Sequence, residues 1–295
     1  MQVINAELNE EKDNNLNSAE FKAILGSPNV EVFENRSTSS KAIYGDCEQK
    51  SSFLIEVLDF SQKQSSSPDV SIIIPAYREE KTITEVIQRV HKVSKSLGEV
   101  EVIVVDDGST DSTGEKVAAF PFVKYIRHER NMGKGAAIRT GIKNSRGKVV
   151  VIQDADLEYL PDCLPSLVKP ISTGKIDIVY GSRFKGKPEG MSFSHFVGNF
   201  LLSFVARFMY NVQITDIMTG QKAFKRSVLD SIELKENGFG VEVELTCLSF
   251  NGGDQRFAEV PITYSYRKQG VSKIKYSDGV QSLIKMFTLF LKTNT

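Results

Sequence analysis

Residues 149–158, VVVIQDADLE, combine a run of apolar residues with three carboxylates. Four apolar residues follow one another without a helical period, which predicts a strand buried on both faces of a sheet. Asp154 and Asp156 stand two residues apart in this extended segment, so their side chains project to the same side at the strand end, with Glu158 within reach. Carboxylates this close repel one another unless a cation lies among them.

Three interpretations of these carboxylates compete. They could form only the acidic first turn of a following helix, but two aspartates and a glutamate exceed what such a turn needs. They could be an acid–base pair for hydrolysis, but neither aspartate has a sequence neighbour that would keep it protonated. They could hold Mg²⁺ or Mn²⁺, with substrate phosphates completing the coordination. The other motifs of the chain favour the cation.

Strand and helix patterns alternate along most of the chain, with polar residues after the strand ends. Further strands are predicted at 70–75, 101–105, Val123–Arg127, 176–180 and 259–262. Helices are predicted at about 80–96, after Gly135 as far as Asn144, and at 162–170, Phe193–Tyr210 and 280–292. This order predicts an α/β domain, 70–295, with a mostly parallel sheet whose carboxyl edge carries the ligand loops.

Composition narrows the function classes. Lysine plus arginine and aspartate plus glutamate both number 37, so the net charge of zero provides no field that would attract nucleic acid. The three cysteines are scattered, which is typical of a reducing compartment and indicates no zinc site. We find neither a secretory signal nor an apolar run long enough to predict a transmembrane helix. Residues 1–69 are polar and predict a mostly disordered N-terminal extension.

Two further segments suit a nucleotide. Residues 131–141, NMGKGAAIRTG, place a glycine-rich turn at a predicted helix N-terminus, which is a plausible cradle for an anion. The spacing matches neither the P-loop nor the Rossmann fingerprint. Asp106 and Asp107 follow a predicted strand, where a carboxylate can accept hydrogen bonds from a base or ribose. Together these segments predict a nucleoside diphosphate with a bridging metal ion.

Four motifs in this order resemble the family-2 inverting glycosyltransferases of the GT-A fold: PAYREE at 75–80, VVDDGSTD at 104–111, NxGKGxAxxxG at 131–141 and QDADLE at 153–158. GSRF at 181–184, DxxTGQKxF at 216–224 and GFGVEVEL at 238–245 make the chain similar to the branch of dolichyl-phosphate mannose synthases and glucosyltransferases. The resemblance implies a GT-A sheet flanked by helices and an enzyme that uses Mg²⁺ or Mn²⁺.

The resemblance also implies roles for individual residues. It assigns the metal to Asp154, Asp156 and Glu158, and catalysis to Asp156 and Arg183. It places the nucleotide at Pro75, Tyr77, Glu79, Asp106, Asp107, Lys134 and Asp154. It places the acceptor phosphate or the donor diphosphate at Ser182, Arg183, Arg267 and Lys273.

The absence of a Glu-Asp dipeptide bears on whether the acceptor is a hydroxyl or a phosphate. Transfer to a sugar hydroxyl needs a general base, commonly an aspartate in a Glu-Asp pair, and no such dipeptide occurs in the chain. A lipid phosphate is already an anion and needs only cations to guide it. We therefore expect transfer of mannose from GDP-mannose, or of glucose from UDP-glucose, to a polyprenyl phosphate, and DxxTGQKxF does not distinguish the two donors. The alternatives are a family-2 enzyme that acts on a glycan or glycolipid hydroxyl, and a non-catalytic nucleotide-sugar-binding protein.

Two apolar helices at the C-terminal end admit two interpretations. Phe193–Tyr210 could pack in the core, or it could lie in the headgroup region of a membrane and admit the polyprenyl tail. Residues 280–292 are amphipathic, with Leu283, Ile284, Phe287 and Leu291 expected on one side. We expect a peripheral protein on the cytoplasmic face of a membrane, attached by these helices, by a membrane-anchoring partner or as a homodimer.

Overall fold

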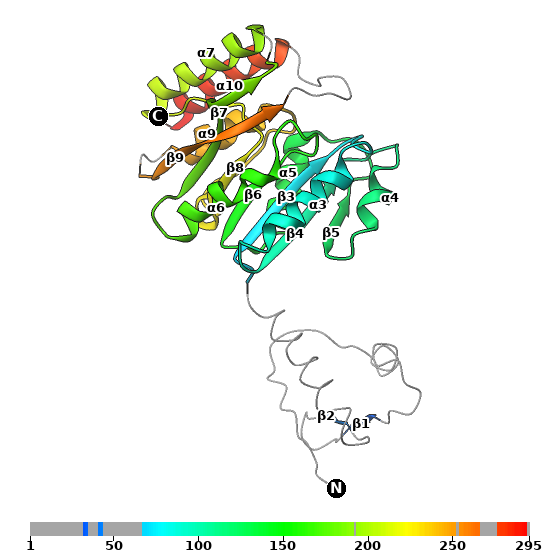
Figure 1. Ribbon diagram of the computed structural model, residues 1–295. Coiled ribbons are helices and arrows are strands. Elements are labelled where there is room, and N and C mark those ends of the chain that lie inside the picture. The colour runs from blue at the N-terminus through cyan, green and yellow to red at the C-terminus, as the bar shows by residue number, and fades with distance from the viewer. Residues whose placement is uncertain are drawn as a thin grey trace. The chain divides into compact units, whose positions relative to one another are not determined.

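The structure of the protein is a computed structural model that describes residues 32–34, 41–43, 67–191, 193–251, 254–265 and 276–293. The chain divides into two compact units, residues 1–66 and 67–295. The first unit contains the short strands β1 (Val32–Glu34) and β2 (Lys41–Ile43), which pair antiparallel. The second unit contains all the other described helices and strands (Figure 1). It also contains every residue that the sequence assigns to a site.

A seven-stranded mixed sheet forms the centre of the second unit, in the order β5-β4-β3-β6-β8-β7-β9. Its strands are β3 (Val70–Ala76), β4 (Val100–Asp106), β5 (Val123–Arg127), β6 (Val149–Ile152), β7 (Ile178–Glu189), β8 (Lys222–Lys225) and β9 (Phe257–Ser265). Strand β8 runs antiparallel to both of its neighbours, while the other pairs are parallel. The expected mostly parallel sheet is therefore confirmed.

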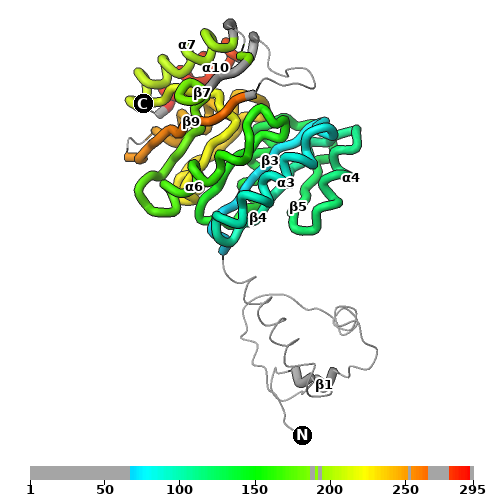
Figure 2. The backbone as a smooth tube through the Cα atoms, in the orientation of Figure 1, coloured from blue at the N-terminus to red at the C-terminus, as the bar shows by residue number. Residues whose placement is uncertain are grey.

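Helices cover both faces of this sheet because its strands are apolar on both faces. Ile72 and Ile74 of β3 pack with α3 (Ile83–Ser94) and α6 (Leu164–Ser172). The intervening Ile73 packs on the opposite face with α5 (Lys134–Lys143) and α9 (Val241–Ser249). The remaining helical segments are α4 (Thr113–Ala118), η1 (Pro161–Cys163), α7 (Phe193–Tyr210), α8 (Arg226–Asp230) and α10 (Tyr276–Thr293). Figure 2 traces the same layers.

Two strands are longer than the sequence predicted. The strand predicted at 176–180 continues to Glu189, and the one predicted at 259–262 extends over Phe257–Ser265. These two strands pair in parallel, with an irregularity between Ser182 and Lys187. The added strand residues include polar and charged side chains, so they do not extend an apolar run in the sequence. Hydrogen bonds between the two strands define these residues as sheet instead.

Helices α7 and α10 lie side by side above one end of the sheet (Figure 1). The Tyr210 hydroxyl donates to the Met286 carbonyl at 3.3 Å, and the rings of Tyr210 and Phe290 are 5.7 Å apart. Leu202 and Ala206 of α7 are buried, so core packing describes one side of that helix. Of the helices that the structure describes, none combines the length and apolar composition needed to cross a membrane.

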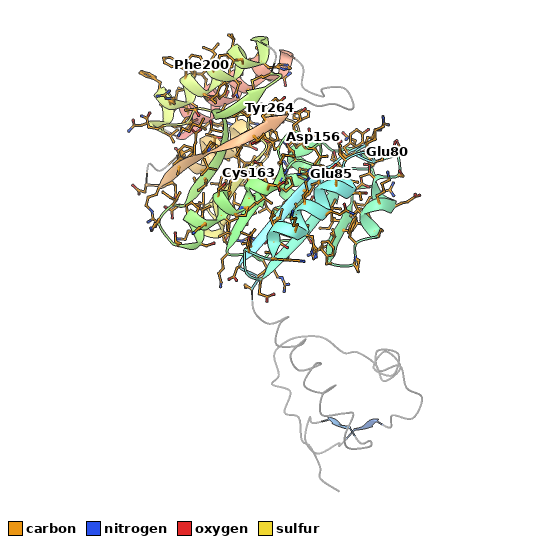
Figure 3. All side chains as sticks on the ribbon, viewed as in Figure 1. Glu80, Glu85, Asp156, Cys163, Phe200 and Tyr264 are labelled. Carbon is orange, nitrogen blue, oxygen red and sulfur yellow. The ribbon has the colours of Figure 1, made fainter. Side chains whose placement is uncertain are left out.

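The outer sides of α7 and α10 are apolar and exposed, and we call them the outer apolar face. Its residues are Phe196, Val197, Phe200, Leu201, Phe204 and Phe208 of α7, and Val280, Ile284, Phe287 and Leu291 of α10. Figure 3 shows Phe200 projecting from α7. Leu283, which we expected on the same side as Ile284, is partly buried against the core instead.

Candidate functional site

A cavity of about 610 Å³ lies at the carboxyl ends of β3, β4 and β6. Loops leave the sheet there, and the parallel strands bring their ends to one edge. Among its lining residues are nine that the sequence assigned to a site: Pro75, Tyr77, Glu79, Asp107, Lys134, Asp154, Asp156, Glu158 and Arg183. Figure 3 marks Asp156 and Tyr264, which also lines the cavity. The sheet thus brings most of the predicted site together.

The loop after β6 turns sharply between its acidic residues. Leu157, between Asp156 and Glu158, has a φ of 61°, a left-handed conformation that is uncommon for a residue with a side chain. The Glu158 amide donates to Asp156 Oδ1 at 3.1 Å. Gly220 lies against Asp154, and a Cβ atom there would overlap the Asp154 carboxylate. Backbone geometry and a neighbouring glycine therefore fix the position of these carboxylates.

Lys134, the first residue of α5, forms ion pairs with two carboxylates of the cavity. Its Nζ lies 2.6 Å from Asp154 Oδ1 and 2.8 Å from Glu242 Oε1. The other Glu242 oxygen contacts Lys222, which is completely buried at the start of β8. These four charged residues form a chain that begins in the cavity and ends in the core.

Burial and charge act in opposite directions on these groups. Burial raises the pKa of Asp154, although the Lys134 ammonium opposes this shift. This effect of burial on Asp154 arises from the fold and not from the sequence neighbours of that residue. Burial alone would also raise the pKa of Glu242, but Lys134 and Lys222 outweigh it and lower that pKa. Burial lowers the pKa of Lys222, against the effect of the Glu242 carboxylate.

The glycine-rich turn before α5 is not an open anion cradle, contrary to the sequence-based interpretation. The amides of Met132 and Gly133 donate to the Asp107 carboxylate at 2.9 and 2.7 Å. The amides of Gly135 and Ala136 donate to the Asn237 carbonyl at 2.7 and 3.3 Å. The protein itself therefore uses these amides. The glycines of the turn allow the backbone of Glu236 and Asn237 to approach closely.

The two aspartates after β4 lie in different surroundings. Asp107 lines the cavity, and its Oδ1 is 2.7 Å from His128 Nδ1, while His128 Nε2 is 2.9 Å from the Thr140 hydroxyl. Asp106 is completely buried, accepts from the Ser109 amide at 2.8 Å and the Tyr125 hydroxyl at 2.8 Å, and does not line the cavity. These contacts suit Asp106 to holding the loop, and its nucleotide role stays a prediction.

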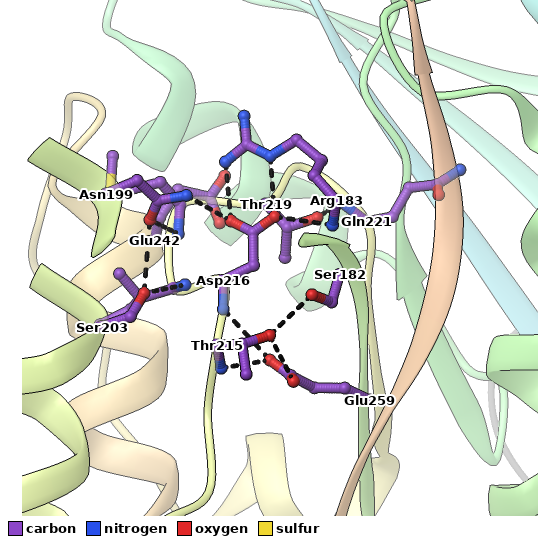
Figure 4. Close-up of polar contacts among 12 residues, drawn as sticks. Ser182, Arg183, Asn199, Ser203, Thr215, Asp216, Thr219, Gln221, Glu242 and Glu259 are labelled. Carbon is purple, nitrogen blue, oxygen red and sulfur yellow. Dashed lines mark hydrogen bonds and ion pairs between the residues drawn. The ribbon is translucent and has the colours of Figure 1, made fainter. Parts of the chain in front are cut away.

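Arg183 reaches the cavity from β7 and forms a buried ion pair with Asp216. Its Nε and Nη2 donate to the two Asp216 oxygens, each at 2.7 Å, and Asn199 donates to Asp216 at 2.6 Å (Figure 4). The rings of Tyr159 and Tyr264 lie 5.6 and 5.5 Å from the guanidinium carbon. Burial opposes ionisation of Asp216, but the Arg183 cation outweighs it and lowers the pKa of that carboxyl.

The other predicted acceptor residues are not gathered at the cavity. The Ser182 side chain is buried beside Thr215, with 2.7 Å between the two hydroxyl oxygens, and Thr215 in turn bonds to Glu259 (Figure 4). Ser182 does not line the cavity. Arg267 and Lys273 lie outside the described residues. All three assignments stay predictions.

The carboxylates fit a divalent cation that also binds substrate phosphates. Asp154 and Asp156 line one cavity and offer oxygen ligands, which Mg²⁺ and Mn²⁺ prefer. Within the described ranges, no group of three or more acidic, histidine or cysteine side chains is arranged to hold an ion. Mg²⁺ is usually held by one or two carboxylates together with substrate phosphates, which Asp154 and Asp156 could provide. The third proposed ligand, Glu158, stays a prediction.

Sequence reasoning missed several residues that shape the site: Glu242, Lys222, Asp216, Asn199 and His128. Three of them lie in motifs that carried the family resemblance, so the motifs were a signal that more than the strand ends mattered. Their roles depend on partners distant in sequence. Asp216 is 33 residues from Arg183, for example, and nothing local to either residue indicates the pair.

Comparison with known proteins identifies the family. Residues 71–233, more than half of the chain, match the profile of Glycosyl transferase family 2. The polyprenol monophosphomannose synthase of Mycolicibacterium smegmatis is 32% identical over 228 residues, covering 73% of this chain and 84% of that protein. The dolichol-phosphate mannosyltransferase of Pyrococcus furiosus is 34% identical over 220 residues, covering 70% of this chain but only 59% of that protein.

A solved structure has a similar fold. Glucosyl-3-phosphoglycerate synthase from Mycobacterium tuberculosis, in complex with phosphoglyceric acid, superposes with a TM-score of 0.63 at 25% identity. The match covers 75% of this chain and 80% of that chain.

The chain belongs to glycosyl transferase family 2 and is a glycosyltransferase. The expected GT-A fold and the resemblance to the dolichyl-phosphate mannose synthase branch are confirmed.

Proposed function

We propose that the protein transfers a hexose from a nucleotide sugar to a polyprenyl phosphate at a membrane surface, with inversion and with a divalent cation. One observation carries the proposal: a single cavity has a charged end and an apolar end. Asp154, Asp156 and Lys134 line the first, and Leu201 and Val280 line the second. Both apolar residues also belong to the outer apolar face, where their exposed fractions are 49% and 60%.

The charged end suits the donor. Asp154 and Asp156 would hold Mg²⁺ or Mn²⁺, which when bound neutralises the diphosphate and assists its departure. Lys134 brings a second cation to the same place, because its Nζ lies 2.6 Å from Asp154 Oδ1. Pro75, Tyr77 and Asp107 line the neighbouring wall of the cavity, where the nucleoside of GDP-mannose or UDP-glucose would lie.

Arg183 is suited to guide the acceptor phosphate. Asp216 engages Nε and Nη2 of the guanidinium, and Nη1 has no hydrogen-bond partner within the described part of the chain. A phosphate that reaches this nitrogen meets a cation fixed in position by a buried carboxylate. The acceptor already carries a negative charge, so attack on the anomeric carbon requires no removal of a proton from it.

The surroundings of Glu242 support a phosphate acceptor over a hydroxyl acceptor. Glu242 lines the cavity, so it is a candidate general base for deprotonating a sugar hydroxyl. Its two oxygens, however, contact the ammonium groups of Lys134 and Lys222, which lower its pKa. A carboxylate with a lowered pKa and two cationic partners is a poor proton acceptor.

The outer apolar face supports action at a membrane. Phe200, Phe204 and Phe208 are 56%, 57% and 87% exposed, and Ile284 and Leu291 of the neighbouring helix α10 are exposed as well. Exposed apolar side chains gathered on two neighbouring helices are typical of an interaction site or a membrane contact. Its continuity with the cavity would let a polyprenyl chain remain in lipid while its phosphate reaches Arg183. Residence on the cytoplasmic face of the membrane stays a prediction.

The proposal is tested by incubating the full chain with Mn²⁺, a short polyprenyl phosphate and labelled GDP-mannose or UDP-glucose, and then extracting the organic phase. We expect label in that phase with one of the donors. The same reaction with a polyprenol that lacks the phosphate should give none. No organic-phase label with either donor, under conditions where the protein binds nucleotide, would refute the acceptor assignment.

A further inference from the structure

The pair of Glu242 and Lys222 lies behind the cavity in a way that core packing alone does not require. Lys222 is completely buried and does not line the cavity. Its ammonium donates to the carbonyls of Ile217 at 3.0 Å and Thr219 at 2.7 Å, its third hydrogen bond goes to Glu242 Oε2, and it lies 5.0 Å from the centre of the Tyr180 ring. All three N–H donors of the Lys222 ammonium are therefore used, and this ammonium holds one oxygen of Glu242 in place.

The other oxygen of Glu242, Oε1, is buried and forms an ion pair with Lys134 Nζ at 2.8 Å, without the geometry of a hydrogen bond. Glu242 belongs to the first turn of α9, where the positive end of the helix dipole favours a carboxylate. Three elements that are distant in sequence, α5, β8 and α9, thus converge on one carboxylate. The side-chain exposures fall along the chain from 15% for Lys134 to 3% for Glu242 and 0% for Lys222.

The charges around Lys134 determine which carboxylate can hold its ammonium. Lys134 pairs with Asp154 as well as with Glu242, and Asp154 is one of the carboxylates that fit a divalent cation. If Asp154 held a divalent cation, that charge would repel the Lys134 ammonium and compete for the same carboxylate. Glu242 would still attract the ammonium, because Lys222 fixes the Glu242 carboxylate from the buried side. Lys134 would then remain at this end of the cavity and could pair with an incoming diphosphate instead of Asp154.

We infer that Glu242 and Lys222 are positioning residues that keep the Lys134 ammonium at the diphosphate end of the cavity when a divalent cation and a nucleotide are bound. The inference rests on the proposed function, because it assumes that a nucleoside diphosphate binds there. It assigns neither residue a contact with the sugar or a proton transfer. The effect of both on the ligand passes through Lys134.

The test compares nucleoside diphosphates with nucleoside monophosphates. Calorimetric titration of the full chain with UDP, UMP, GDP and GMP in the presence of Mn²⁺ gives an affinity for each. For Glu242→Gln we expect the diphosphate affinity to fall about 10- to 100-fold, the range for losing one charge-assisted contact, while monophosphate affinity changes by less than about twofold. Lys134→Met should give a similar selective loss, and adding Glu242→Gln to it should cause little further loss.

Two additional variants separate positioning from folding. Glu242→Gln leaves Lys222 buried without its counterion and should destabilise the fold. Glu242→Gln combined with Lys222→Met removes both charges, so it should recover stability to thermal unfolding but not diphosphate affinity. Asp177→Asn is the matched control. It neutralises a partly buried carboxylate that directly precedes β7 and pairs with Arg256 at 2.8 Å. It should leave both affinities unchanged.

The outcomes distinguish the two proposals. Equal losses of mono- and diphosphate affinity in Glu242→Gln, or recovery of diphosphate affinity together with stability in the combined variant, would mean that the pair is only structural and would overturn the inference. Wild-type protein that binds none of the nucleotides would instead overturn the proposed function, and the inference with it. Selective, non-additive loss of diphosphate affinity supports both.

Discussion

Replacing Arg183 should destabilise the protein as well as impair the acceptor. Arg183→Ala removes two hydrogen bonds of 2.7 Å from Asp216, whose side chain is 0% exposed, and leaves that carboxylate buried with Asn199 and a backbone amide as its remaining partners. Losing one partner of a buried ion pair costs about 3–5 kcal/mol. For a domain of this size, that is about 6–20 °C in melting temperature.

Arg183→Lys gives an intermediate case. The lysine keeps a cation near Asp216 but cannot reproduce the two-pronged contact, so one charge-assisted hydrogen bond is lost, at about 1.5–3 kcal/mol. Circular dichroism during thermal and urea unfolding measures the ranking of wild type, lysine variant and alanine variant. Arg89→Ala is the control, because its pairs with Glu85 and Asp162 are exposed and should contribute less than about 1 kcal/mol.

An Arg183→Ala variant whose free energy of unfolding lies within about 1 kcal/mol of wild type would contradict a buried ion pair, because that small loss is typical of an exposed pair. A destabilised but folded variant allows the second measurement. At a temperature where it is fully folded, its Michaelis constant for the polyprenyl phosphate should rise more than that for the nucleotide sugar. Unchanged acceptor kinetics would leave Arg183 with a structural role only.

Four further predictions follow from single features. Asp156→Ala should abolish Mn²⁺-dependent transfer with an unchanged melting temperature, and full activity in the presence of EDTA would contradict the metal assignment. Gly220→Ala should displace the Asp154 carboxylate and weaken Mn²⁺-dependent UDP or GDP binding, measured by calorimetry, because the added methyl group overlaps that side chain. Phe208→Ser, at a site that is 87% exposed, should lower binding to polyprenyl phosphate-containing vesicles about tenfold in a flotation assay while stability changes by less than about 0.5 kcal/mol. The Arg183 cation lowers the pKa of the Asp216 carboxyl below its ordinary value, although burial opposes this change. The ion pair therefore contributes stability at pH values above that ordinary pKa and loses this contribution as the pH falls through the folded pKa. Asp216→Asn should flatten this acid limb in pH-dependent urea unfolding.

The sheet edge could be predicted from the sequence because its signal is local. Continuous apolar residues at 149–152 and 102–105 predict buried strands, and the carboxylates that follow them lie at one edge when these strands run parallel in one sheet. The same argument failed for the turn before α5. Glycines at a helix N-terminus suggest free amides, but Asp107 and Asn237 accept from those amides, and no local pattern indicates partners so distant in sequence.

The outer helices illustrate a second limit. The apolar spacing of Phe193–Tyr210 predicted the helix correctly, yet the pattern could not distinguish core from surface because the helix is apolar nearly all round. The structure buries Leu202 and Ala206 and leaves Phe200 and Phe204 exposed. Which side of such a helix faces inward depends on the elements that pack against it, here α10 and the cavity wall, and that information is not local.

Residues 216–224, DIMTGQKAF, act on the site almost entirely through other residues. Only Met218 of the segment lines the cavity. Asp216 nevertheless orients Arg183, Gly220 makes room for Asp154, and Lys222 anchors Glu242. Apart from Met218, the segment can influence donor recognition only through Arg183, Asp154 and Glu242. We therefore expect the choice between GDP-mannose and UDP-glucose to depend on the residues that line the nucleoside wall, Pro75, Tyr77 and Asp107.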